Sequence, residues 1–329
     1  MATIEKTSAN NWRITKMYKG KRYRLNVEHK PTKTEAERLI WALIEAAPKE
    51  ITKQSFEKLA NDYIDKKSIT LSPASIRSYA GVLRRIPANI KKQSIKVLSE
   101  DDIQTFINQY SIDHKYNSSR SIIVFINTIL VYAGASKMNI KIPNQEESEF
   151  YVPEDSDIDR ILDHVRGTRW EMIIRLGIYG IRRGEICALN KSDLSEDNIL
   201  TVNKSKVQGK DKKWYIKVPK TKRSIRKFKI ADDLAEIIRN NETEHLVELN
   251  PGGITRQLRR FQKRLGIELF AFHKLRHYFA ATAREVMGDA YVEKMGGWAP
   301  GSNIMKKVYD YAKAEKEKQA QEAFIKRIS

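Results

Sequence analysis

His-Lys-Leu-Arg-His at residues 273–277 decides how the rest of the chain is interpreted, because Gly-Gly-Trp at 296–298 and then Tyr309 follow it. These stretches hold the densest set of phosphate-directed side chains in the sequence. His273 and Arg276 are three residues apart and share one helical face, so both could reach one phosphate. A tyrosine brought to the same place from a later helix would add an oxygen nucleophile. The working hypothesis is therefore a site for phosphate chemistry.

The charge balance points to a polyanionic partner. Lys and Arg total 61 against 41 Asp and Glu, which gives a formal net charge of +20 and a pI near 9.7. The hydrophobic content is ordinary, so a chain of 329 residues can form two or three domains with cores of their own. Nucleic acid is the partner that such a surplus favours. A generally solubilising basic surface is the alternative.

Several other classes of protein are disfavoured. Cys187 is the only cysteine, which excludes an internal disulfide and a Cys-based zinc site and suits a reducing cytoplasm. Residues 1–12 lack the apolar region of a signal peptide, and the most apolar run, residues 122–133, is too short to span a membrane. No carboxylate or histidine spacing matches a metal nuclease, and no phosphate-binding loop of an ATPase is present. We therefore expect a cytoplasmic protein with no cofactor, no metal and no membrane partner.

Residues 1–47 predict a small sheet covered by one helix. Apolar and polar side chains alternate over 12–15 and 22–27, and the intervening residues 18–21 have the composition of a hairpin turn. A capping box at 34–37 then begins a helix. Its apolar stripe consists of Ala36, Leu39, Ile40, Leu43 and Ile44.

The uncovered face of this sheet would carry Arg13, Arg22 and Arg24. A narrow sheet with a basic face can enter the major groove of DNA. The alternative is a face that is merely solvated.

Residues 52–140 predict a helical domain. Apolar residues recur at helical spacing from residue 56 onward, Ser72-Pro73 and 99–102 are helix starts, and the apolar run at 122–132 suits the central helix. Basic residues gather on the second helix and its exit: Arg77, Arg84, Arg85, Lys91 and Lys92. This cluster suits phosphate contact, although a charged run on one helix is more often a solvated face.

A second large domain is predicted over residues 153–329. It begins with helices and continues through strand-like runs at 199–202, 213–218 and 226–230 before helices resume. Arg182 follows a glycine turn, and Glu185 can support its guanidinium, but an ordinary helical ion pair would look the same.

The order of five short motifs resembles that of the tyrosine recombinase family, especially phage-type and mobile-element integrases. The motifs are Gly-Ile-Arg-Arg-Gly-Glu-Ile (180–186), Pro-Lys-Thr-Lys-Arg-Ser (219–224), His-Lys-Leu-Arg-His (273–277), Gly-Gly-Trp (296–298) and Val-Tyr-Asp-Tyr (308–311). The resemblance covers the whole chain. It implies a mainly α fold with small β-sheets: an arm-site DNA-binding module with a three-stranded sheet at 1–47, a helical core-site DNA-binding domain at 52–140, and a mixed α/β, mainly helical catalytic domain with a C-terminal tail at 153–329.

The resemblance also assigns roles to residues that match the family motifs. Arg182 and Arg276 would bind the non-bridging oxygens of the scissile phosphate, His273 would bind the same phosphate and assist proton transfer, and Glu185 would support the site. Trp298 stands where many members have a second histidine. Its indole N–H can donate to phosphate and its ring can pack.

By the same resemblance, Tyr309 would be the nucleophile and would form a 3′-phosphotyrosyl link, with Tyr311 as its rival. Lys220 would protonate the 5′ leaving oxygen, with Lys222 as the alternative if the turn is shifted by two residues. Lys222 and Arg223 could equally be nonspecific DNA contacts.

The expected function is integration, and excision, of a phage or mobile element by strand exchange that needs neither ATP nor metal. Double-stranded DNA with core and arm sites would be the substrate, and the active form would be a tetramer on two paired sites. An excisionase and a host DNA-bending protein are candidate partners. A chromosome or plasmid resolvase would not need residues 1–47, and a catalytically silent DNA-binding regulator would not need the complete set of catalytic side chains.

Overall fold

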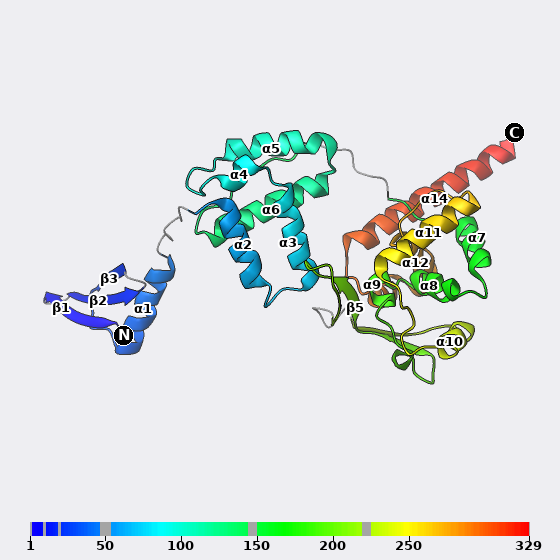
Figure 1. The fold of residues 1–329 in the computed structure, drawn as a ribbon, viewed down its shortest axis with the longest axis horizontal. Helices are drawn as coiled ribbons and strands as arrows, with labels where there is room; N and C mark the ends of the chain where they lie inside the picture. Colours follow the sequence, from blue (N-terminus) through cyan, green and yellow to red (C-terminus); the bar gives the residue numbers. More distant parts are fainter. Residues whose placement is uncertain are drawn as a thin grey trace. The chain divides into compact units, whose positions relative to one another are not determined.

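The structure is a computed structural model that describes residues 2–8, 11–18, 21–46, 54–143, 150–218 and 225–328. The chain divides into two compact units, one formed by residues 1–65 and 82–144 and the other by 66–81 and 145–329. The described residues are mainly helical and form small antiparallel sheets, so the predicted fold class is confirmed (Figure 1).

A three-stranded antiparallel sheet begins the chain. Its strands are β1 (Thr3–Ser8), β2 (Asn11–Tyr18) and β3 (Lys21–Val27), with β2 in the middle. Helix α1 (Lys33–Ala46) covers one face, where Ile14, Ala36 and Ile40 are completely or almost completely buried (Figure 1). The alternation of apolar and polar side chains in β2 and β3 thus gives the sheet one buried and one open face.

The sequence predicted the wrong capping residue for α1, Thr34. The hydroxyl of Thr32 accepts a hydrogen bond from the backbone N–H of Glu35 at 3.2 Å, so Thr32 is the capping residue rather than Thr34. Both threonines are followed three residues later by a glutamate, and the sequence pattern alone does not distinguish them.

Five helices follow: α2 (Phe56–Lys67), α3 (Pro73–Arg85), α4 (Ala88–Lys92), α5 (Glu100–Asp113) and α6 (Tyr116–Tyr132). Ile122, Ile126 and Ile129 of α6 are buried, and the ring of Phe125 meets that of Phe56 edge-on at 6.4 Å. The Ser99 hydroxyl accepts from the backbone N–H of Asp102, which confirms the predicted cap of α5. The long apolar helix therefore provides much of the core of the helical part, as its sequence indicates.

The remaining elements begin with α7 (Asp155–Val165), α8 (Arg169–Ile178), α9 (Arg183–Ile186) and the 3-10 turn η1 (Lys191–Asp193). Four short strands follow: β4 (Ile199–Val202), β5 (Ser205–Gln208), β6 (Trp214–Lys217) and β7 (Arg226–Lys229). The last helices are α10 (Asp232–Arg239), α11 (Pro251–Leu265), α12 (Lys274–Met287), α13 (Asp289–Gly296) and α14 (Asn303–Ile328).

The strands form two antiparallel pairs, β4 with β7 and β5 with β6. The sequence predicted β4, β6 and β7 but missed β5, whose four residues include a single apolar side chain, Val207. Strand β5 is therefore defined by its pairing with β6 and not by its own periodicity.

The start of α14 is fixed against α12 and α13. Met305 and Val308 are buried with Phe279, Ala280 and Val292 in one apolar cluster. Near the far end of α14, Phe324 and Ile325 are 62% and 56% exposed.

A second contact to α14 involves a buried histidine of α12. The ring of His277 stacks on Phe150 at 4.5 Å, and Phe150 meets Tyr311 of α14 edge-on at 6.3 Å. His277 Nδ1 lies 3.3 Å from the carbonyl oxygen of Tyr151. Burial and the positive charge of Lys274 lower the pKa of His277 to about 4.

We expect the folding stability to decrease as the pH falls from about 6.5 towards 4. In this window the unfolded chain protonates His277 while the folded chain does not, so the free energy of unfolding falls with pH. The loss from this residue at about pH 5 is at most about 2 kcal/mol. In chemical denaturation, His277→Gln should lose less stability than the wild type on acidification. His245→Gln, which replaces an exposed histidine, should behave as the wild type; equal losses in all three proteins would contradict this assignment.

Candidate active site

Arg182 is positioned by a glycine turn after α8. Gly180 has a positive φ of 78°, and a Cβ atom there would lie 2.6 Å from the ring of Phe279, so both the backbone conformation and the close approach of α12 favour glycine. Arg182 then precedes α9, and its side chain is 38% exposed. The turn thus presents a partly exposed guanidinium beside the first residues of α12.

Glu185 holds Arg182 in place. Its carboxylate accepts hydrogen bonds from the backbone N–H and from Nη1 of Arg182, both at 2.9 Å. The same carboxylate accepts from Nη1 and Nη2 of Arg226 at 3.2 and 2.7 Å. Burial favours the protonated acid, but the hydrogen bonds and charge of Arg226, together with Arg182, outweigh it and lower the pKa of Glu185.

Arg276 is buried with part of its hydrogen-bonding capacity unused. The side chain is among the largest that are fully buried, with 1% exposure, and its Nη1 donates to the carbonyl oxygen of Gly180 at 2.5 Å. Its Nε and Nη2 have no hydrogen-bond acceptor among the residues that the structure describes. A buried charged donor without a partner is costly, by about 1–3 kcal/mol or more, so these two groups favour an anionic ligand.

The charges around Arg276 strengthen this preference. Burial, followed by the charges of Arg182 and Arg226, lowers the pKa of Arg276, and Glu185 only partly offsets them. A guanidinium remains protonated at neutral pH. Three guanidinium groups and one carboxylate therefore lie in this cluster, which carries a surplus of positive charge.

Trp298 covers Arg276. The centre of its ring lies 3.8 Å from Arg276 Cζ, a cation–π contact, and the ring stacks on Phe279. A Cβ atom on Gly296 would lie 2.1 Å from the Trp298 ring, so the glycine makes room for the indole. The Gly-Gly-Trp motif thus closes one side of the guanidinium with an apolar surface.

His273 directly precedes α12. Partial burial, followed by the charges of Arg276 and Arg182, lowers the pKa of His273 to about 4. The imidazole is accordingly neutral at pH 7 and can donate one hydrogen bond and accept another.

Two predicted catalytic residues are described only in part or not at all. Tyr309 lies in the second turn of α14, directly after the buried Val308, and its side chain is outside the described set. The predictions for Lys220, Lys222 and Arg223 fall on residues 219–224, which lie outside the described residues.

The sequence interpretation missed Arg226. This residue shares the buried face of β7 with Phe228, while the alternate residues Lys227 and Lys229 are exposed. An arginine in the apolar register of a strand is the signal that could have identified it. Arg226 and Arg182, far apart in the sequence, bind the same carboxylate, and Arg276 lies near enough for their charges to lower its pKa.

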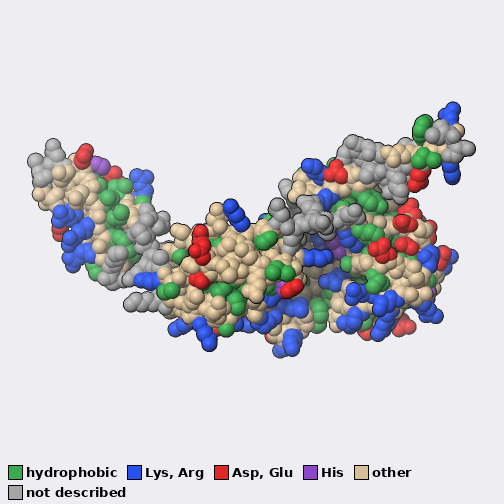
Figure 2. Space-filling view, turned by 90° about the horizontal axis from the view of Figure 1, so that it is seen from above, with side chains coloured by type: hydrophobic (Ala, Val, Ile, Leu, Met, Phe, Trp, Pro, Cys, Tyr) green, Lys and Arg blue, Asp and Glu red, His purple; other side chains and the backbone are tan. Residues whose placement is uncertain are grey.

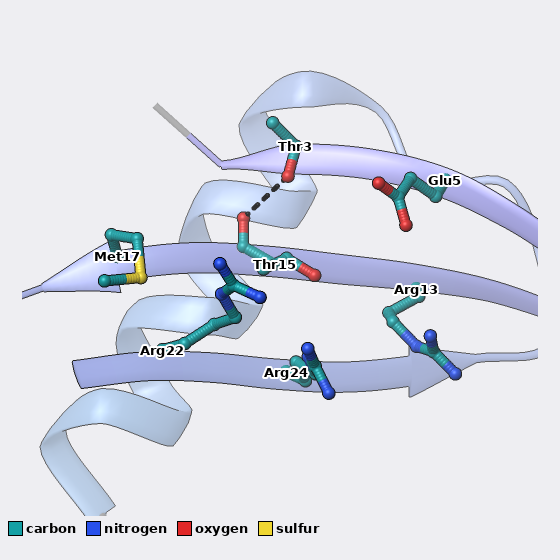
Figure 3. A pocket seen from close by; sticks show the side chains of 7 residues that line it. All are labelled: Thr3, Glu5, Arg13, Thr15, Met17, Arg22 and Arg24. Atoms are coloured by element: carbon teal, nitrogen blue, oxygen red, sulfur yellow. Dashed lines mark hydrogen bonds between the residues drawn. The ribbon is translucent and has the colours of Figure 1, made fainter.

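Five of the residues predicted to bind DNA lie at the surface of the part of the chain that the structure describes: Arg13, Arg22, Arg24, Arg77 and Arg84. Figure 2 shows Lys and Arg side chains in several separate groups on the visible face. Arg77 and Arg84 are exposed on α3. Figure 3 shows Arg13, Arg22 and Arg24 together on the open face of the N-terminal sheet, where they line a concavity of about 500 Å³ with Thr3, Glu5, Thr15 and Met17.

Among the described residues, no helix is long and apolar enough to cross a membrane. In that same part of the chain, no group of three or more histidine, cysteine, aspartate or glutamate side chains is arranged to hold a metal ion.

Several solved structures with a similar fold are integrases. The Tn1549 transposon integrase in complex with transposon right end DNA has a TM-score of 0.63 at 16% identity and covers 81% of this chain and 100% of its own. A lambda integrase tetramer bound to a Holliday junction has a TM-score of 0.58 at 13% identity, with coverage of 92% and 94%. A lambda integrase dimer bound to a core site has a TM-score of 0.59 at 15% identity, with 94% of both chains covered. At these identities the similarity establishes the fold.

The sequence itself matches two family models. The model of the phage integrase family matches residues 154–316, and that of the phage integrase N-terminal SAM-like domain matches residues 55–111. A search of curated protein sequences gave no match. The two matched domains and the shared fold show that the chain belongs to the tyrosine recombinase family, the family of the phage integrases.

Proposed function

We propose that the chain is a site-specific DNA integrase that cleaves and rejoins DNA strands through a 3′-phosphotyrosyl intermediate. The observation that carries this proposal is the buried guanidinium of Arg276, whose Nε and Nη2 lack acceptors among the described residues. A phosphodiester supplies oxygen acceptors and one negative charge, which is what this site needs.

The charge of the cluster suits the transition state better than the substrate. Arg182, Arg226 and Arg276 carry three positive charges and Glu185 one negative charge, which leaves a surplus of two. The phosphodiester is a monoanion, whereas the pentavalent arrangement formed by nucleophilic attack is a dianion. Charge stabilisation therefore increases as the reaction proceeds, which accelerates the chemical step.

The reaction exchanges one phosphorus–oxygen bond for another. The hydroxyl oxygen of Tyr309 attacks the phosphorus, the bond to the 5′ oxygen breaks, and a 3′-phosphotyrosyl link and a free 5′-hydroxyl result. In this proposal Arg182 and Arg276 bind the non-bridging oxygens, and neutral His273 accepts the proton that the Tyr309 hydroxyl loses. Lys220 is proposed to protonate the leaving oxygen. Because the tyrosyl link conserves the energy of the broken bond, rejoining requires no ATP, and the arginine clamp supplies the positive charge without a metal.

The N-terminal sheet supports an integrase over a chromosome or plasmid resolvase. Its open face combines three arginines with small polar side chains, and a sheet of this width fits a DNA groove. We propose that it binds arm sites while the helical domain, through Arg77 and Arg84, binds the core. The lambda integrase tetramer on a Holliday junction supports a tetramer on two paired sites as the active form. An excisionase and a DNA-bending protein remain proposed partners.

The nucleophile can be tested with a nicked duplex that traps the covalent intermediate. Its core can be selected by wild-type protein from random-sequence DNA. Tyr309→Phe should form no covalent complex, because the attacking oxygen is removed. Tyr311→Phe is the matched control and should still form one, since the Tyr311 ring packs against Phe150. A covalent complex that persists in Tyr309→Phe and disappears in Tyr311→Phe would reverse the assignment.

The arm-site proposal predicts that substitutions on the open face of the N-terminal sheet weaken binding of arm-type DNA without affecting core cleavage. With the full chain held on an immobilised core duplex, Arg22→Gln/Arg24→Gln should weaken capture of a second, arm-type duplex. It should also reduce the salt dependence of that capture by about two in log–log slope. Core cleavage should persist. The matched pair Lys33→Gln/Arg38→Gln removes two exposed charges from α1 and should keep both activities. Equal effects of the two pairs would refute the assignment of the open face.

A further inference from the structure

Arg226 is joined through Glu185 to Arg182, the arginine of the motif at residues 180–186. Its side chain is 2% exposed, so it contributes no surface for DNA, and both its terminal nitrogens point to Glu185. Residue Arg226 begins β7 and pairs with Val202 of β4. It is therefore anchored in a sheet, whereas Arg182 lies in a turn before a helix of four residues.

The hydrogen bonds of Glu185 link the two arginines symmetrically. Oε1 accepts from Nη1 of Arg182 at 2.9 Å and from Nη1 of Arg226 at 3.2 Å. Oε2 accepts from the backbone N–H of Arg182 at 2.9 Å and from Nη2 of Arg226 at 2.7 Å. Each carboxylate oxygen thus takes one bond from each arginine, which fixes both the position and the rotation of the carboxylate.

We infer that Arg226 is a positioning residue that acts through Glu185 to hold the Arg182 guanidinium at the scissile phosphate. The inference rests on the proposed function. Without Arg226, half of the bonds to the buried carboxylate disappear, and burial then favours its protonated form. A neutral, rotatable side chain no longer fixes Arg182, and a displacement of about 1 Å can cost about 100-fold in rate.

The first test compares two substrates under single-turnover conditions with saturating protein. Arg226→Met should slow covalent-complex formation about 10- to 100-fold on the ordinary nicked core duplex, with unchanged affinity for that DNA. The second substrate carries a methyl group in place of one non-bridging oxygen of the scissile phosphate, which removes the charge that Arg182 neutralises. On this neutral substrate the defect should be much smaller. An equal defect on both substrates would indicate general structural damage and overturn the inference.

The second test asks whether Arg226 acts through Glu185. Combining Arg226→Met with Glu185→Gln should slow cleavage no more than Glu185→Gln alone, because the link is already broken; additive losses would overturn the inference. Arg226→Lys should recover part of the rate, since it keeps the charge but not the paired bonds. Lys229→Met, an exposed change on the same strand, is the matched control.

The outcomes separate the inference from the proposed function. If wild-type protein forms no covalent complex on the ordinary duplex, the proposed function fails. If the wild type reacts and Arg226→Met, folded by circular dichroism, reacts at the same rate, only the role of Arg226 fails.

Discussion

The paired hydrogen bonds between the Glu185 carboxylate and two arginines are the interaction on which the site depends. Glu185 is buried, and burial by itself favours the protonated acid, so the two arginines are what lower the pKa of this carboxyl group. Arg226 from a strand and Arg182 from a turn both donate to it. The ion pair therefore links the small β4–β7 sheet to the turn after α8 and sets where the exposed guanidinium lies.

Arg276 adds a different constraint, because its burial is only partly compensated. It donates to Gly180 and lies against the Trp298 ring, yet two of its nitrogens have no acceptor among the described residues. A buried charged donor without an acceptor lowers the free energy of unfolding. The cost is understandable if the missing acceptors belong to a DNA phosphate, since preorganised donors need no rearrangement when charge develops in the reaction.

Much of the site could be predicted because its residues belong to short motifs in a fixed order. Arg182, Glu185 and Arg276 were predicted to cooperate, and they lie in one charged cluster. Arg226 was missed because its place in the apolar register of a strand does not reveal its partner, which is 41 positions away in the sequence. The cap of α1 and strand β5 were misjudged for a related reason: neighbouring threonines compete for one role, and four polar-rich residues acquire strand structure from their partner.

The sequence by itself determined the class of fold, and it predicted the phosphate chemistry and most of the residues that we propose for the site. Helix periodicity, strand alternation and motif order are local properties that each segment carries independently of its neighbours. Only the tertiary structure decided which charges meet. Contacts between segments far apart in the chain bury Arg276, bind Glu185 to two arginines and place the Trp298 ring against the Arg276 guanidinium. Their electrostatic strength comes from the exclusion of water when those segments pack together.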